Sequence, residues 1–488
     1  MSSARPKSSH PSLYEIFTRI WLGDLSRAAG APITLATVPD ATLDRLAALG
    51  FDFIYLMGVW TLGEEGPRLS RADPELRLDY DLSLHGWKDE DVVGSPFAIA
   101  RYTVDPIFGG DEGLASLRAR LAERGVGLLL DFVPNHVARD HHWVSEQPGL
   151  FLRDAKGALL PGKDPYFAPW KDTAQLDIRL QKTRAALIGE LASIAERCDG
   201  VRCDMAMLVI DEVFRKNWAK TPPAAGEEEA KGELWAEAID RTRARFPGFL
   251  FVAEAYWDRE WRLQMLGFDY TYDKSFYDRL VHGSAPLVRG HLAATLDYQR
   301  RCVRFVENHD EQRISSLLPP DRRNAATVLA ATVPGMRLFH DGQLEGRELK
   351  ASLHLGRRAD EPADAKTVLF HDKLLAALRH PALREGNFAQ LQPREAAPNV
   401  AGAESIVAHR WDSRRGAVVV IVNFSASRSR CRITLDLEGS AGRSLAFTDL
   451  FTDEVFLRDG DELIDPTRGL YVELAAYAMH FFALRRNT

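Results

Sequence analysis

Cysteine is scarce in this chain. The chain also has no excess of positive charge and no long apolar run. The four cysteines among 488 residues form no CxxC pair and no zinc spacing, which excludes a disulfide scaffold and predicts reduced thiols. Lys and Arg number 62 against 69 Asp and Glu, and a net charge of -7 argues against nucleic acid or an anionic membrane as a partner. Residues 1–11 lack the apolar core of a signal peptide, and no apolar stretch reaches the roughly 18 residues of a membrane span. The sequence therefore predicts a cytoplasmic protein.

The residues that are present predict an α/β fold. Hydrophobic residues make up 45% and charged residues 27%, as in globular proteins. Short apolar runs alternate with helical segments up to about residue 350, which predicts parallel βαβ units closed into a (β/α)8 TIM barrel. The eight expected strands lie at residues 13–21, 51–56, 126–133, 200–206, 249–253, 268–272, 302–306 and 336–339.

Three regions depart from this alternation. Residues 58–111 are polar and contain glycine, and we expect a functional loop because ordinary connections are shorter. Residues 137–178 show no clear periodicity and contain four prolines, which predicts a short inserted subdomain after the third strand. Residues 381–488 hold short alternating strands separated by turns, which predicts a C-terminal antiparallel β-sandwich domain. The barrel is then expected at residues 1–136 and 179–380.

Polar residues end four of the apolar strands. An apolar strand that ends in Asp or Glu loses stability unless the carboxylate is paired or functional, and the strand ends of a barrel meet on one face. Two carboxylates that flank a bond favour glycoside hydrolysis. Arg202 and Asp204 lie on one face of their strand, where the cation would keep the carboxylate ionised as a nucleophile requires. Alone, this pair is equally typical of a buried ion pair that only holds the strand. The four strand ends are residues 131–136, 202–204, 251–254 and 305–310.

In order, these four segments resemble the four signature regions of the α-amylase family, glycoside hydrolase family 13, of retaining α-glucoside hydrolases and transglycosylases. The likeness covers residues 12 to about 350, and the C-terminal domain fits the family's layout. It implies a retaining α-glucoside hydrolase that acts on α-glucans or short malto-oligosaccharides by double displacement, through a covalent glycosyl-Asp204 intermediate.

The resemblance also implies a role for individual residues. Asp204 would be the nucleophile, oriented by Arg202, and Glu254 would be the general acid and then the base. Asp310 would bind sugar hydroxyls and stabilise the distorted sugar ring. Retention implies that the carboxyl groups of Asp204 and Glu254 lie about 5–5.5 Å apart.

Other implied contacts surround the same sugar ring. His136 and His309 would donate hydrogen bonds to its hydroxyls, and Phe97 would stack on it where many family members have a tyrosine. Asp131 and Asn135 would support the end of the third strand.

The segment after the nucleophile departs from the family pattern. Many amylases have Lys-His where this chain has Met207 and Leu208, at positions that contact the leaving group and contribute to a calcium site. With the short subdomain, this favours an enzyme of short oligosaccharides. We expect no required cofactor and assign no metal ligand, and a dependence on calcium stays open.

Several alternatives stay open at this point. A transglycosylase or a phosphorylase of the same family would share the first half-reaction and differ in the acceptor. A non-catalytic carbohydrate-binding relative would typically lose the acidic residues, which are present here. A metal-dependent barrel hydrolase would need His-x-His on its first strand, and Phe17-Thr-Arg-Ile offers none. The expected partner is a small carbohydrate, and the oligomeric state stays open.

Overall fold

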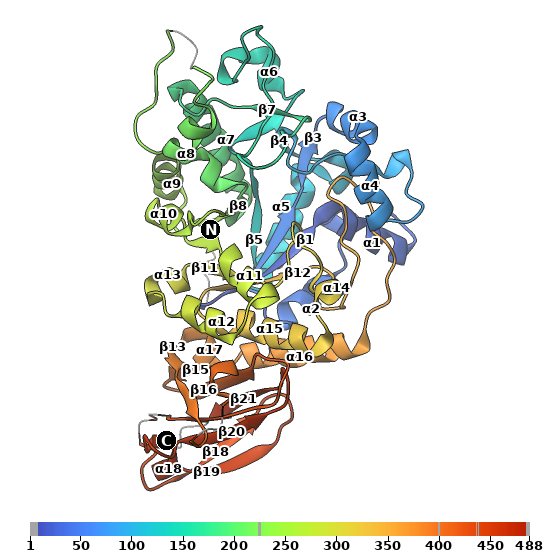
Figure 1. The fold of residues 1–488 in the computed structure, drawn as a ribbon. Helices are drawn as coiled ribbons and strands as arrows, with labels where there is room; N and C mark the ends of the chain where they lie inside the picture. Colours follow the sequence, from blue (N-terminus) through green and yellow to red (C-terminus); the bar gives the residue numbers. More distant parts are fainter. Residues whose placement is uncertain (1–7, 223–225, 399–400, 436, 438, 485–488) are drawn as a thin grey trace. The chain divides into compact units, whose positions relative to one another are not determined.

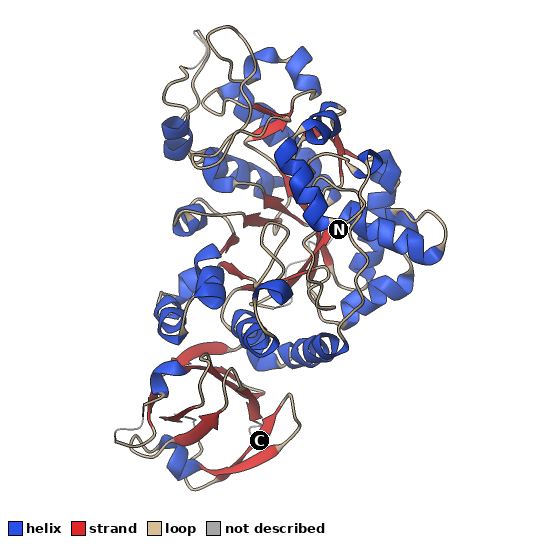
Figure 2. Ribbon diagram, turned by 45° about the vertical axis from the view of Figure 1, so that its right-hand side comes forward, coloured by secondary structure: helices blue, strands red, loops and turns tan. Residues whose placement is uncertain are grey.

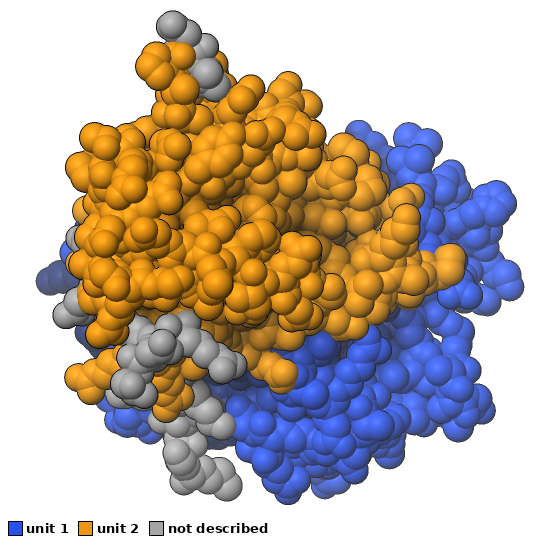
Figure 3. Space-filling view, turned by 90° about the horizontal axis from the view of Figure 1, so that it is seen from below, with its two compact units in different colours: residues 1–5, 13–272, 349–361 blue, residues 6–12, 273–348, 362–488 orange. Residues whose placement is uncertain are grey.

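The computed structural model describes residues 8–222, 226–398, 401–435, 437 and 439–484. The chain divides into two compact units (Figure 3). Unit 1 consists mainly of Leu13–Tyr272 with Leu349–Glu361, and unit 2 mainly of Asp273–Glu348 with the chain from Pro362 onward. None of the helices in the described part combines the length and the apolar character that crossing a bilayer requires.

Eight strands form a closed barrel in the order β1-β12-β11-β10-β9-β8-β5-β2 (Figure 1). Every residue of these strands is buried, which explains their almost continuous apolar sequences, since strands covered on both faces have no polar side. The predicted TIM barrel is confirmed. Its strands are β1 (Ser12–Phe17), β2 (Phe53–Met57), β5 (Gly127–Phe132), β8 (Gly200–Cys203), β9 (Leu250–Ala253), β10 (Tyr270–Tyr272), β11 (Cys302–Arg304) and β12 (Met336–His340).

Helices alternate with these strands along the chain (Figure 2). The longer ones are α1 (Thr18–Ala29), α2 (Asp40–Ala48), α5 (Gly110–Glu123), α7 (Gln181–Arg197), α9 (Leu234–Arg245), α11 (Lys274–His282), α15 (Pro320–Thr332) and α16 (Ala365–Leu378). The expected first strand was too long, because α1 already begins at Thr18. The pairing of β1 with β2 ends at Phe17 and Met57. The next residue after β2, Gly58, has φ +74° and turns the backbone away from β1. Beyond Phe17 the chain therefore has no strand partner on that side.

The region expected to be a long loop, residues 58–111, is largely ordered into helices and a two-stranded sheet. Strands β3 (Trp60–Leu62) and β4 (Ile99–Val104) pair antiparallel, and α3 (Glu65–Ala72) and α4 (Pro74–Ser83) lie between them in sequence. Asp73 caps α4 by accepting a hydrogen bond from the backbone N–H of Glu75 at 3.0 Å, and Pro74 occupies the first helical position. The expectation of a loop was wrong.

The stretch predicted as an inserted subdomain contains a short two-stranded antiparallel sheet, an α-helix and a 3-10 helix (Pro148–Leu150). Strands β6 (His136–Ala138) and β7 (Thr173–Gln175) pair antiparallel, and α6 (His142–Glu146) follows β6. The amide of Gln175 donates to the backbone oxygen of Asn135 at 2.7 Å, which ties β7 to the segment after β5. The predicted domain limits stay predictions.

The C-terminal part of unit 2 is antiparallel, as predicted. A six-stranded sheet runs β13-β15-β16-β21-β18-β19 and a three-stranded sheet runs β14-β17-β20. Apolar side chains from both sheets, among them Val419, Ile433 and Phe447, form one core. The strands are β13 (Asn387–Leu391), β14 (Pro393–Glu395), β15 (Ile406–Ser413), β16 (Gly416–Asn423), β17 (Ser429–Ile433), β18 (Ser444–Asp449), β19 (Val455–Asp459), β20 (Leu470–Leu474) and β21 (Met479–Leu484).

Candidate active site

The end of β8 holds two ionisable side chains side by side. Strand β8 pairs with β5 on one side and with β9 on the other. Arg202 lies in β8, and Asp204 follows it directly with its backbone N–H donating to the oxygen of Phe132 at 2.9 Å. Both side chains are almost completely buried.

One guanidinium contacts two carboxylates in unit 1. Nη1 of Arg202 lies 2.6 Å from Oδ1 of Asp204, and Nη2 lies 2.9 Å from Oε2 of Glu254. The exposed fractions of Asp204 and Glu254 are only 5% and 3%, and buried charges of this kind persist only when they are paired. Burial lowers the pKa of Arg202, but its anionic neighbours, Glu254 first, outweigh burial and hold that pKa well above its ordinary value. The structure therefore brings these three predicted residues together.

Two aromatic rings cover the same guanidinium. The Cζ atom of Arg202 lies 5.2 Å from the ring centroid of Phe97 and 5.7 Å from that of Tyr272, within the range of cation–π attraction. Phe97 is thus beside the carboxylate pair. Its stacking on a sugar ring stays a prediction.

The backbone after β8 is fastened to Glu254. The N–H of Met205 donates to Oε2 of Glu254 at 2.5 Å, and the N–H of Ala206 donates to the backbone oxygen of Glu254 at 3.2 Å. Met205 has a left-handed backbone with φ +42°, an unfavourable conformation for a residue with a side chain, of the kind that clusters at functional sites. The loop after the nucleophile strand therefore fixes one oxygen of Glu254.

Tyr256 is a contact that sequence reasoning missed. Its hydroxyl donates to Oε1 of Glu254 at 3.0 Å. The signal was present in the spacing, since residues two apart in an extended segment point to the same side.

Asp131 at the end of β5 has the structural role expected of it. Its fully buried carboxylate accepts hydrogen bonds from the hydroxyl of Tyr55 and, at 2.6 Å, from the N–H of Gly58. Burial raises the pKa of Asp131 to about 6, against the lowering effect of these donors. Gly58 is required here, because φ is +74° and a Cβ atom would lie 2.9 Å from Cβ of Pro96.

His136 is buried at the start of β6. Its ring centroid lies 5.0 Å from that of Trp170, and its Nδ1 lies 3.3 Å from the amide nitrogen of Asn135. Burial lowers the pKa of His136, which favours the neutral imidazole with one N–H to donate. Donation to a sugar hydroxyl stays a prediction.

The remaining predicted residues, His309 and Asp310, lie in unit 2 after β11. Nε2 of His309 is 3.1 Å from Oδ2 of Asp310, and the side-chain oxygen of Asn308 accepts the N–H of Asp310 at 2.9 Å. Sequence reasoning gave no site role to Glu307 and Arg313, but these two form a buried ion pair at 2.7 Å beside the segment. The participation of His309 and Asp310 in the site around Asp204 stays a prediction.

Met207 and Leu208 are buried. Both lie in the short 3-10 helix Ala206–Val209 with exposed fractions of 0% and 1%. Both side chains are therefore packed in the interior, and the contacts of a leaving group stay a prediction.

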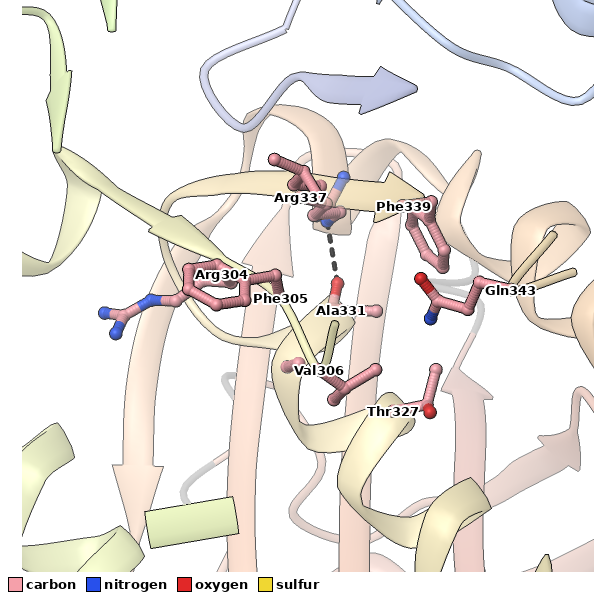
Figure 4. Close-up of a pocket in the computed structure, with 10 residues that line it drawn as sticks. Arg304, Phe305, Val306, Thr327, Ala331, Arg337, Phe339 and Gln343 are labelled. Carbon is pink, nitrogen blue, oxygen red and sulfur yellow. Dashed lines mark hydrogen bonds between the residues drawn. The ribbon is translucent and has the colours of Figure 1, made fainter. Parts of the chain in front are cut away.

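Unit 2 contains a separate small cavity between β11, β12 and α15 (Figure 4). Its volume is about 10 Å³, room for roughly one water molecule, and Arg337 closes one side by donating to the backbone oxygen of Ala331 at 2.7 Å. This cavity is too small for a sugar. Across the described residues, no three His, Cys, Asp or Glu side chains are grouped so that they could hold a metal ion.

A family model and several known proteins are similar to this chain in sequence. Residues 41–156 match the family model described as alpha amylase, catalytic domain. The chain is 25% identical over 449 residues to the alpha-amylase MalA of Haloarcula japonica, an alignment that covers 88% of this chain and 57% of that protein. It is 27% identical over 259 residues to the alpha-1,4-glucan:maltose-1-phosphate maltosyltransferase of Bifidobacterium longum, which covers 52% of this chain and 30% of that enzyme. The chain thus spans from about a third to just over half of these relatives.

Solved structures show the same fold over the whole chain. The maltogenic alpha-amylase AmyB from Thermotoga neapolitana superposes with a TM-score of 0.72 at 18% identity, covering 98% of this chain and 99% of that one. An alpha-amylase from Lactobacillus plantarum gives a TM-score of 0.68 at 22% identity, with coverage of 97% and 99%.

Proposed function

We propose that this chain belongs to the α-amylase family and is a retaining enzyme that cleaves α-glucosidic bonds by double displacement. The observation that carries the proposal is the guanidinium of Arg202, which contacts both Asp204 and Glu254. One cation that holds two buried carboxylates next to each other supplies the pair of groups that this chemistry requires.

The contact between Arg202 and Asp204 indicates which oxygen of Asp204 attacks in the first half-reaction. Arg202 holds Oδ1 of Asp204, so we assign Oδ2 as the atom that attacks the anomeric carbon. The bond from that carbon to the leaving oxygen breaks, Glu254 gives its proton to the leaving oxygen, and a glycosyl ester forms on Asp204.

The second half-reaction reverses these roles. Glu254 takes a proton from the acceptor, the acceptor oxygen attacks the anomeric carbon, and the ester bond to Asp204 breaks. Two inversions give net retention. Asp310, His309, His136 and Phe97 complete the proposed substrate contacts, on the strength of the sequence resemblance.

The acceptor distinguishes the candidate functions. Water gives a hydrolase, which we propose as the main activity, on α-glucans or short malto-oligosaccharides. A sugar or phosphate acceptor gives a transglycosylase or phosphorylase, and this alternative is favoured by the maltosyltransferases among the relatives. We also propose that the reaction needs no cofactor, because the two carboxylates perform both half-reactions, and that the protein is cytoplasmic, in keeping with its four free, buried thiols.

The proposal is tested by incubation with maltose, maltotriose, sucrose, trehalose and soluble starch, with and without phosphate. Chromatography identifies the products, and proton NMR gives their anomeric form, which is expected to be α at early times. Glu254→Gln should lower kcat by orders of magnitude and keep the fold, because it removes only the transferable proton. Asp204→Asn should abolish the covalent intermediate. Wild-type turnover in either variant, or faster cleavage of starch than of maltotriose, would contradict the corresponding part of the proposal.

A further inference from the structure

The two carboxyl oxygens of Glu254 have contacts of different kinds. Oε2 accepts from the N–H of Met205 at 2.5 Å and lies 2.9 Å from Nη2 of Arg202. A backbone N–H and a guanidinium can only donate, so a proton on Oε2 would face these two donors. Oε1 instead lies 3.0 Å from the hydroxyl of Tyr256, a group that can either donate or accept. The transferable proton of Glu254 therefore belongs on Oε1.

A tight turn holds Tyr256 in place. The N–H of Arg259 donates to the backbone oxygen of Tyr256 at 3.3 Å and closes the turn over Trp257 and Asp258. Both central residues have left-handed φ values, +63° and +58°. Turns with two positive φ values normally contain glycine, asparagine or aspartate, and Trp257 is none of these. Strained backbone of this kind persists where the surrounding structure requires it, often at functional sites. The backbone of Tyr256 is thus fixed by this turn and by β9, which ends three residues before it.

We infer that Tyr256 is a positioning residue for the acid/base carboxylate of Glu254. The inference rests on the proposed function and deepens it. While Glu254 is protonated, the hydroxyl accepts the proton of Oε1 until the leaving oxygen takes over as acceptor. After this proton has passed to the leaving oxygen, the hydroxyl donates to Oε1 and stabilises the ionised carboxylate.

The second half-reaction uses the same contact in the opposite direction. The proton of the acceptor passes to Oε1 of Glu254, and the hydroxyl of Tyr256 becomes an acceptor again. Tyr256 itself loses and gains no proton over the cycle. A hydrogen bond to the charged form of a carboxyl group favours that form. Removal of the hydroxyl should therefore make Glu254 keep its proton up to a higher pH.

Other ionisable side chains of unit 1 also surround Glu254. Arg202 contacts it directly, and Asp204 shares that guanidinium. Tyr272 on β10 faces the same group, since burial first, and the charge of Glu254 among further causes, raise the pKa of Tyr272. A change of Tyr256 to phenylalanine leaves these side chains as they are, so a shift of the pH profile can be attributed to the hydroxyl.

The test is the pH dependence of kcat/KM in Tyr256→Phe, which keeps the ring and removes the hydroxyl. On maltotriose, the basic limb of this profile reports the loss of the proton that Glu254 must give to the leaving oxygen. The limb should move up by about one pH unit in the variant. α-Maltosyl fluoride is the control substrate, because fluoride leaves without a proton. Its profile should show no limb from Glu254 in either protein.

Tyr471 offers a matched control variant. Its hydroxyl donates to Oε2 of Glu473 at 2.9 Å, again across a spacing of two residues, but within β20 of the C-terminal sheet. Tyr471→Phe removes the same kind of hydrogen bond and should leave the pH profile unchanged. A thermal unfolding curve for each variant shows that it is folded.

The outcomes separate the inference from the proposed function. A basic limb that stays in place in Tyr256→Phe, with the wild-type limb present on maltotriose, would overturn the role of Tyr256 and leave the proposed function standing. An equal fall of kcat/KM on both donors without a shift would show a merely structural effect and would overturn it too. A wild-type protein that turns over neither donor would overturn the proposed function itself.

Discussion

At the scale of single residues, the guanidinium of Arg202 decides the geometry of the candidate site. Its two terminal nitrogens contact different carboxylates, Asp204 and Glu254. Lysine carries one compact ammonium and cannot bind both in this way. Arg202→Lys should therefore lower kcat/KM about 10²- to 10³-fold on α-maltosyl fluoride or maltotriose. It should also lower the Tm, because a buried carboxylate loses its partner. Activity within threefold of wild type would show that the double contact is unimportant.

Asp131 gives a prediction on pH. Its pKa is raised by burial to about 6 in the folded state, against about 3.9 in an unfolded chain. Between pH 4 and 6 the folded state thus binds a proton that the unfolded state has lost, so stability falls as the pH rises. The wild type should lose about 2 kcal/mol relative to Asp131→Asn across this window. Thermal unfolding of both proteins at pH 4 and pH 7 checks this, and a Tm difference that is the same at both pH values would contradict it.

At the scale of elements, the approach of β8 to β9 depends on a glycine. A Cβ atom at Gly200 would lie 2.6 Å from the backbone oxygen of Leu250, the residue paired with it. Gly200→Ala should destabilise the protein by about 1–3 kcal/mol and lower activity, because the same strand carries Arg202.

The helix before this strand offers a matched control. Gly189 lies within α7, and a Cβ atom added there would have no neighbouring atom within 4 Å, so Gly189→Ala should stabilise the helix by about 0.5–1 kcal/mol. Tm and kcat/KM of the two variants are compared. Equal behaviour of Gly200→Ala and Gly189→Ala would show that the close approach of the strands is not limiting.

The elements also show what a sequence reveals and what it does not. All eight barrel strands were predictable, because strands covered on both faces are mainly apolar even where they carry a polar residue such as Asp131 or Arg202. Helix α4 was missed because its polar and apolar residues alternate one by one and show no helical period, although Asp73 followed by Pro74 is a helix start signal. The hydrogen bond from Tyr256 to Glu254 was within reach of a period-two argument. The left-handed backbone of Trp257 was not, since no local residue preference indicates it.

At the scale of the whole molecule, the proposed chemistry depends on carboxylates, and we expect it to need no bound ion. Treatment with EDTA followed by desalting should leave kcat on maltotriose and the Tm unchanged, because Asp204 and Glu254 are held by Arg202 and by backbone N–H groups. An amylase of established calcium dependence is the positive control in the same assay. Loss of activity that calcium restores would contradict the expectation.

The position of Arg202 has one more consequence, for the net charge of the site during turnover. Before the first step, the group of three contains the cation, the ionised nucleophile and a protonated Glu254, and its net charge is zero. In the glycosyl ester the nucleophile is neutral and Glu254 is ionised, and the net charge is zero again. The guanidinium exchanges its principal anionic partner at each half-reaction without moving. A site in which these three side chains are almost completely buried can therefore complete the cycle without stabilising an uncompensated charge.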